Sequence, residues 1–68
     1  MVTAEYDWFW NVKTNRYYFH DRAGKVIGEV YETVTSPGLY RALYENKVLG
    51  MYINKEFAKQ AIINQYEN

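Results

Sequence analysis

Residues 39–66 read LYRALYENKVLGMYINKEFAKQAIINQY and contain signals for both a β-hairpin and a helix. The first part of this stretch contains two short runs rich in apolar and aromatic residues, which predict β-strands at about 39–44 and 47–53. Glu45-Asn46 lies between the runs and predicts a tight turn, because Asn tolerates the left-handed backbone conformation. These residues therefore predict a β-hairpin.

The hydrophobic period changes at Asn54, a residue type that caps helix N-termini well. Glu56 follows in the first turn, where an acid interacts favourably with the helix dipole. We therefore predict an amphipathic helix over about 55–66. Its apolar residues recur at spacings of three and four: Phe57, Ala58, Ala61, Ile62 and Tyr66.

The preceding residues predict three more strands, at about 6–12, 16–21 and 25–33. Turns are expected at 13–15 and 22–24, where Asn15 and Gly24 supply left-handed backbone, and Ser36-Pro37-Gly38 is the strongest break in the chain. The prediction is one α+β domain over residues 1–68. It consists of a five-strand antiparallel meander packed on one C-terminal helix.

The chain contains a short internal repeat, because Lys25-Val26-Ile27-Gly28 recurs as Lys47-Val48-Leu49-Gly50. The repeat predicts two similar hairpins and aligns Tyr18 with Tyr40. A glycine inside a strand marks a bulge or a close backbone approach. We expect one of these features at each glycine.

Composition excludes several classes of protein. The chain has 68 residues, no cysteine and a formal net charge of zero. A disulfide framework and a thiolate metal site are therefore excluded, and a strongly electrostatic partner is disfavoured. No apolar run approaches the roughly 18 residues of a membrane span. The first residues carry acids, unlike the basic start of a signal peptide, so we predict a soluble cytoplasmic protein with no membrane partner.

Both faces of the predicted sheet carry apolar side chains, although one helix covers only one face. One interpretation is that the sheet curls and buries part of both faces, with cross-strand aromatic pairs stabilising the fold. The other is a protein-binding platform, because Tyr and Trp dominate interface hot spots. The sequence leaves open which face the helix covers. The predicted protein-binding residues are Trp8, Trp10, Tyr18, Tyr40 and Tyr44.

Catalytic chemistry is not expected. The single histidine, His20, is next to Asp21 in a predicted strand, and strand neighbours point to opposite faces. Ser36 lies in a loop signal, and the isolated glycines form no phosphate loop. We therefore predict a protein that is not an enzyme, with no catalytic residue, no cofactor and no metal site.

Within residues 38–62 a pattern of small and apolar residues runs through Gly38, Tyr40, Ala42, Val48, Leu49, Gly50, Tyr52, Ala58 and Ala61. This pattern resembles the ethylene-response-factor and integrase arm-binding type of DNA-binding domain. In that group a three-stranded sheet packs on one helix and enters the DNA major groove through Arg and Trp side chains, which the resemblance would imply here. On the matching strands this chain offers only Arg41 and Lys47 as basic residues, and acids Glu29, Glu32 and Glu45 would face phosphates.

The function predicted from sequence is a small non-enzymatic module that binds another protein through an aromatic sheet face. A phage or mobile-element accessory protein that modulates a host factor fits this description. One alternative is a sheet that binds DNA or RNA, and the other is a structural homodimer paired by edge strands or by the aromatic face. The nucleic-acid alternative depends on Arg16, Arg22, Lys25, Arg41 and Lys47.

Overall fold

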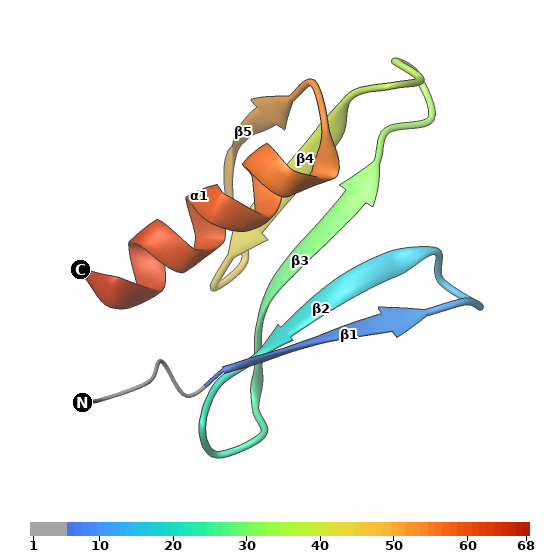
Figure 1. Ribbon diagram of the computed structural model, residues 1–68. Helices are drawn as coiled ribbons and strands as arrows, with labels where there is room; N and C mark the ends of the chain where they lie inside the picture. The colour runs from blue at the N-terminus through green and yellow to red at the C-terminus, as the bar shows by residue number, and fades with distance from the viewer. Residues whose placement is uncertain (1–5) are drawn as a thin grey trace.

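The computed structural model describes residues 6–68, so the interpretation of the first five residues lies outside the described part. Five antiparallel strands form one sheet in chain order, and a C-terminal helix packs against it (Figure 1). This confirms the predicted α+β meander. The elements are β1 (Asp7–Asn11), β2 (Arg16–His20), β3 (Val26–Glu32), β4 (Tyr40–Tyr44), β5 (Lys47–Tyr52) and α1 (Lys55–Glu67).

The turns follow from residues that accept left-handed backbone. Asn15 has φ 61° and its N–H donates to the carbonyl of Asn11 at 2.8 Å, which closes the β1–β2 hairpin. Gly24 has φ 84° in the β2–β3 turn. Both residues of the β4–β5 turn, Glu45 and Asn46, have positive φ values of 50° and 68°, as a type I′ hairpin turn requires.

Helix α1 begins where the sequence predicts it. The Asn54 side-chain Oδ1 accepts a hydrogen bond from the Phe57 N–H at 2.9 Å, so Asn54 is the N-cap. Ala58 and Ile62 are the buried residues of the helix. The prediction that Phe57 belongs to the buried stripe is wrong, because its side chain is 55 % exposed. Phe57 lies about 100° round the helix from Ala58 and points away from the sheet.

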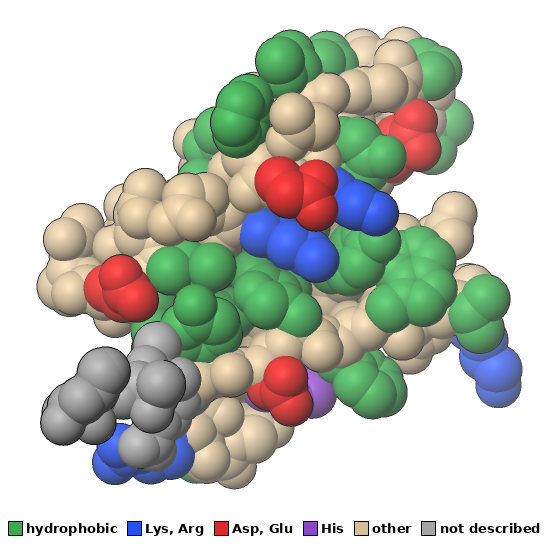
Figure 2. Space-filling model, in the orientation of Figure 1, with side chains coloured by type: hydrophobic (Ala, Val, Ile, Leu, Met, Phe, Trp, Pro, Cys, Tyr) green, Lys and Arg blue, Asp and Glu red, His purple; other side chains and the backbone are tan. Residues whose placement is uncertain are grey.

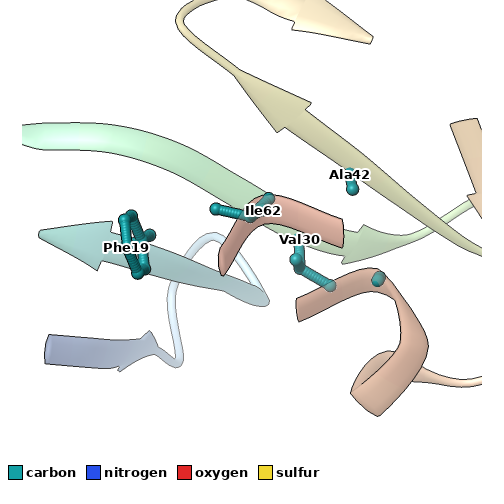
Figure 3. Close-up of a cluster of buried hydrophobic side chains, with 5 residues drawn as sticks. Phe19, Val30, Ala42 and Ile62 are labelled. Carbon is teal, nitrogen blue, oxygen red and sulfur yellow. The ribbon is translucent and has the colours of Figure 1, made fainter. Parts of the chain in front are cut away.

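The core lies between α1 and the middle of the sheet. Phe19, Val30 and Ala42 point from three adjacent strands toward Ile62 of the helix (Figure 3). These four side chains and that of Ala58 are fully buried. Tyrosine and tryptophan side chains surround this small core and complete it, with ring contacts such as Trp8 against Phe19 at 5.0 Å.

Each of the two similar hairpins has a β-bulge next to its strand glycine. Gly28 pairs with Phe19 while Val26 pairs with His20, which leaves Ile27 as the extra residue. The β4–β5 hairpin repeats this arrangement, with Gly50 opposite Ala42, Val48 opposite Leu43, and Leu49 as the extra residue. Of the two features expected at a strand glycine, a bulge or a close backbone approach, a bulge is present beside both Gly28 and Gly50.

The alignment of Tyr18 with Tyr40 is wrong by one residue. Tyr17 pairs with Val30, which lies two residues after Gly28 in β3. Tyr40 pairs with Tyr52, which lies two residues after Gly50 in β5. Tyr17 and Tyr40 are therefore the equivalent residues. The β2–β3 connection is longer than the two-residue β4–β5 turn, and the difference shifts the first strand of the hairpin by one position.

The helix covers only part of the sheet. Within residues 6–68 its backbone approaches β3, β4 and β5 but not β1 or β2. The sheet twists strongly, so that the β1–β2 hairpin extends away below the helix (Figure 1). No helix in the described part of the chain is long and apolar enough to cross a membrane.

Candidate functional site

The strand register assigns the sheet side chains to two faces. The inner face carries Phe19, Val30 and Ala42 and meets α1, and the outer face is the opposite one. Trp8 and Trp10 pair with Phe19 and Tyr17, so both tryptophans lie on the inner face. Tyr40 and Tyr44 lie there too, packed against the core, whereas Tyr18 lies on the outer face. The five sequence-predicted binding residues therefore do not form one surface.

On the inner face, lysines of the helix reach over the uncovered aromatic rings of the β1–β2 hairpin. The Lys59 Nζ lies 4.2 Å from the ring centroid of Tyr17 and 5.3 Å from that of Trp8. The Lys55 Nζ donates to the Tyr17 hydroxyl at 3.0 Å, and this hydrogen bond raises the pKa of Lys55. Figure 2 shows basic side chains along the helix edge above a band of hydrophobic ones.

These contacts extend from the helix to rings of β1 and β2, the two strands that the helix backbone does not approach. The lysine stems lie along apolar surface while their charged heads remain in water, and each head also faces a ring. Tyr44 lies on the inner face of the sheet and is half-buried, and this burial raises the pKa of its hydroxyl. The inner aromatic residues are thus already in contact with groups of the chain itself.

The outer face has no covering element among the described residues. The exposed apolar side chains Val48 and Met51 lie on it next to β4, and Phe9 lies on it at the opposite edge. No lysine is present in the two central rows of this face. One row is Phe9, Tyr18, Glu29, Leu43 and Val48, and the other is Arg16, Tyr31, Arg41 and Met51.

Arg16 is held in place on the outer face. Its Nη1 donates to the Glu29 Oε1 at 2.6 Å, and its Cζ lies 4.0 Å above the Tyr31 ring centroid. The ion pair neutralises the charge of Arg16, and the ring contact fixes the plane of the guanidinium. Arg16 therefore behaves as a rigid and neutralised part of this face.

Arg41 lies on the other side of Tyr31 and is poorly paired. Its Nη1 is 3.5 Å from the Tyr31 hydroxyl, which is a long contact, and its Nη2 is 3.6 Å from the Met51 sulfur, which is a weak acceptor. The buried Nε has no hydrogen-bond partner. Among residues 6–68 no carboxylate is within ion-pairing distance of Arg41. A guanidinium is thus held among apolar groups without a counter-charge.

The five basic residues of the nucleic-acid alternative are divided between two regions. Arg16 and Arg41 lie on the outer face. Arg22 and Lys25 lie in the β2–β3 connection, and Lys47 begins β5 at the same end of the sheet. Acids accompany the basic residues of that end, since Asp21 precedes Arg22 and Glu45 lies in the adjoining β4–β5 turn. The structure therefore does not bring the five together into one basic stripe.

Two other polar groups have local structural contacts. The His20 ring stacks on Phe9 at 5.6 Å between centroids. The Asp21 Oδ1 accepts hydrogen bonds from the Ala23 and Lys25 N–H groups, both at 2.9 Å, which stabilises the β2–β3 connection. Residues 6–68 contain no group of three or more potential metal-ligating side chains.

Comparison of the chain with protein-family models, with curated proteins and with solved structures finds no match. Function is therefore inferred from the surface itself. Sequence reasoning missed Tyr31 and Met51 as outer-face residues. Tyr31 follows the buried Val30 and Met51 follows Gly50, so alternation along each strand predicts that both side chains point to the outer face. In β5 the bulge before Gly50 interrupts this alternation, and the face of Met51 cannot be read from the start of the strand.

Proposed function

We propose that this protein is a small binding module that recognises another protein through the outer face of its sheet. The observation that carries the proposal is the position of Arg41, a guanidinium that lies between Tyr31 and Met51 on the uncovered face and has no carboxylate partner among residues 6–68. Of the binding residues predicted from sequence, Tyr18 belongs to this face.

The composition of the outer face favours a protein over a nucleic acid. Aromatic residues, Met and Arg are enriched in protein interfaces and Lys is depleted, which matches the two central rows. A phosphate-binding surface requires several unpaired cations, because backbone contacts supply most of the affinity. Here Glu29 neutralises Arg16, and Arg41 is the one remaining cation in those rows.

Charge complementarity specifies the chemistry of the partner. Arg41 requires a carboxylate, and the planar guanidinium binds a carboxylate with two parallel hydrogen bonds. The apolar neighbours Leu43, Val48 and Met51 require apolar side chains around that carboxylate. The partner is therefore a protein surface with an Asp or Glu surrounded by apolar residues.

A photo-crosslinking comparison tests this proposal. Val48 and Phe57 have nearly equal exposed fractions, 58 % and 55 %, but Val48 lies on the outer face and Phe57 on the helix. p-Benzoylphenylalanine is placed at each position separately, and each variant is irradiated in lysate of the source organism. We expect a protein adduct from position 48 and none from position 57. Arg41→Gln in the same chain should remove the adduct.

Three results would contradict the proposal. The first is equal adducts from positions 48 and 57, which would indicate nonspecific contact. The second is an adduct at position 48 that persists in the Arg41→Gln variant. The third is an adduct that nuclease removes and that weakens steeply as salt rises, which would identify a nucleic-acid module.

A further inference from the structure

The sheet has two edge strands, β1 and β5, and they differ in regularity. β5 is interrupted by the bulge at Leu49, and Gly50 beside it has φ 156°, a conformation that side-chain-bearing residues rarely adopt. Bulges of this kind protect an edge against pairing. In β1, all five residues pair with β2 without a register shift. β1 is therefore the edge suited to accept another strand.

The hydrogen bonds show which backbone groups of β1 point outward. The Asn11 carbonyl closes the hairpin by accepting from Asn15, so Asn11, and with it Phe9, belongs to the pairs bonded to β2. The Trp8 N–H instead donates to the Asp7 side chain at 3.1 Å. The backbone groups of Trp8 and Trp10 therefore face away from β2.

We infer that β1 pairs antiparallel with β1 of a second copy of the chain, with Phe9 opposite Phe9 of that copy. This register places Trp8 of each copy opposite Trp10 of the other. The outward carbonyl groups of both residues and the Trp10 N–H then bond across the new junction, and the Trp8 N–H exchanges the Asp7 side chain for the Trp10 carbonyl of the other copy. The two sheets become one continuous sheet of ten strands.

The register is complementary in side chains as well as in backbone. Asp7 comes to lie opposite Asn11 of the other copy. The Asn11 Oδ1 accepts from the Lys13 and Thr14 N–H groups, at 2.9 and 3.2 Å, so the group that Asn11 brings to the new pair is its NH2 donor. No like charges face each other across the junction. An Asp7 carboxylate accepts well from an amide NH2 group.

The same register covers the exposed aromatic surface of β1. Phe9 is 55 % exposed and Trp10 is 46 % exposed. Phe9 packs against its counterpart on the outer face, and Trp10 against Trp8 on the inner face, as directly opposed residues do. The junction involves one short strand per copy and falls below the roughly 1,200 Å² of standard interfaces, so we expect a concentration-dependent dimer.

This inference does not depend on the proposed function. Arg41, Val48 and Met51 are on the side of the sheet near β5, away from the β1 junction. Dimerisation can therefore fail while the outer face binds its partner, and the reverse also holds. If both are correct, the dimer presents two outer faces on one continuous sheet.

Cysteine crosslinking tests the register. The chain has no cysteine, so one substitution introduces a single thiol. Phe9→Cys places two thiols opposite each other in a non-hydrogen-bonded pair, where the Cβ distance approaches that of a disulfide. Val48→Cys is the matched control, since Val48 is 58 % exposed on the same face at the other edge. We expect a disulfide-linked dimer from Phe9→Cys under mild oxidation and none from Val48→Cys.

A second measurement removes one backbone donor and retains every side chain. A 68-residue chain is accessible to chemical synthesis, so Trp10 can be introduced with an N-methyl group. Sedimentation equilibrium from micromolar to millimolar concentration should show dimer formation by the unmodified chain and its loss in the N-methyl chain, while circular dichroism shows the same fold. Phe9→Lys, which places like charges across the junction, should also abolish the dimer.

The inference is overturned if the unmodified chain is monomeric throughout this range. It is also overturned if Val48→Cys crosslinks as readily as Phe9→Cys, or if the N-methyl chain dimerises normally. A monomeric chain whose binding to another protein is lost on N-methylation of Trp10 would show that a strand of that protein, and not a second copy, occupies this edge.

Discussion

Gly28 and Ile62 are in direct contact, so the helix packs on the backbone of β3. A Cβ atom at Gly28 would lie 3.0 Å from the Ile62 Cγ2 and 3.2 Å from the Phe19 Cβ. Real Cβ atoms are essentially never closer to a neighbouring atom, so the distance between helix and sheet depends on the absence of a side chain at Gly28. Ile62 fills that space and is fully buried.

Gly28→Ala should therefore destabilise the protein. The added methyl group forces Ile62 or Phe19 to move, and overpacking of this kind typically costs about 1–3 kcal/mol. Chemical denaturation measures the change in the free energy of unfolding. In the Gly28→Ala/Ile62→Val double variant, the combined loss should be smaller than the sum of the two single losses. Strict additivity would show that the two positions are not coupled.

Asn54→Ala should reduce the free energy of unfolding by about 1 kcal/mol, because it removes the side-chain acceptor of the Phe57 N–H. Thermal and chemical denaturation check this prediction. Asn64→Ala is the control in the same helix. Asn64 is exposed and its side chain accepts a hydrogen bond from Gln60, so its replacement should change stability by less than about 0.5 kcal/mol. Equal losses for the two variants would contradict a capping role for Asn54.

The two outer-face arginines should respond in opposite ways to replacement by Met. Arg41→Met removes a buried Nε that has no partner and keeps the apolar stem, so the free energy of unfolding should be unchanged or higher by about 1 kcal/mol. Arg16→Met leaves the half-buried Glu29 without its ion-pair partner and should lower the free energy of unfolding by about 0.5–1 kcal/mol. A larger loss for Arg41→Met than for Arg16→Met would show that Arg41 is retained for stability.

The pH dependence of stability should depend on Tyr44 under alkaline conditions. Burial raises its pKa above the ordinary value of about 10, so the folded state retains the hydroxyl proton where the unfolded state loses it. This contribution is fully present below about pH 10 and is lost as the pH rises through the folded-state pKa. Tyr44→Phe should therefore lose less stability than the wild-type chain between about pH 8 and pH 11 in denaturation measurements. Equal losses would contradict this assignment.

The strands and the helix could be predicted because their signals are local. Alternating apolar residues, Asn15 and Gly24 in turns, and Asn54 at the start of the helix each act within a few residues. The predicted strand ends differ from the observed ones by about one residue, since terminal pairs depend on the neighbouring strand. Phe57 was misassigned because periodicity does not reveal where the sheet beneath a helix ends.

The candidate site was less predictable. Sequence reasoning selected Trp8, Trp10, Tyr40 and Tyr44 because they are large and amphipathic, and these residues lie on the inner face with the core and the lysines. The sequence shows that these four residues are large and aromatic, but it does not show on which face of the sheet they lie. The bulges at Ile27 and Leu49 change the parity of two strands, so alternation along one strand does not carry over to the next.

Local sequence signals specify the secondary structure, the antiparallel order of the strands and a sheet that is aromatic on both sides, because propensity, turn chemistry and hydrophobic period are properties of neighbouring residues. Three features follow instead from the packed fold: which face the helix covers, which residues share the outer face with Arg41, and which edge of the sheet is regular. Those outcomes depend on close packing between distant residues. Ile62 packs on Gly28, where a side chain would collide with it, and the helix lies over β3, β4 and β5.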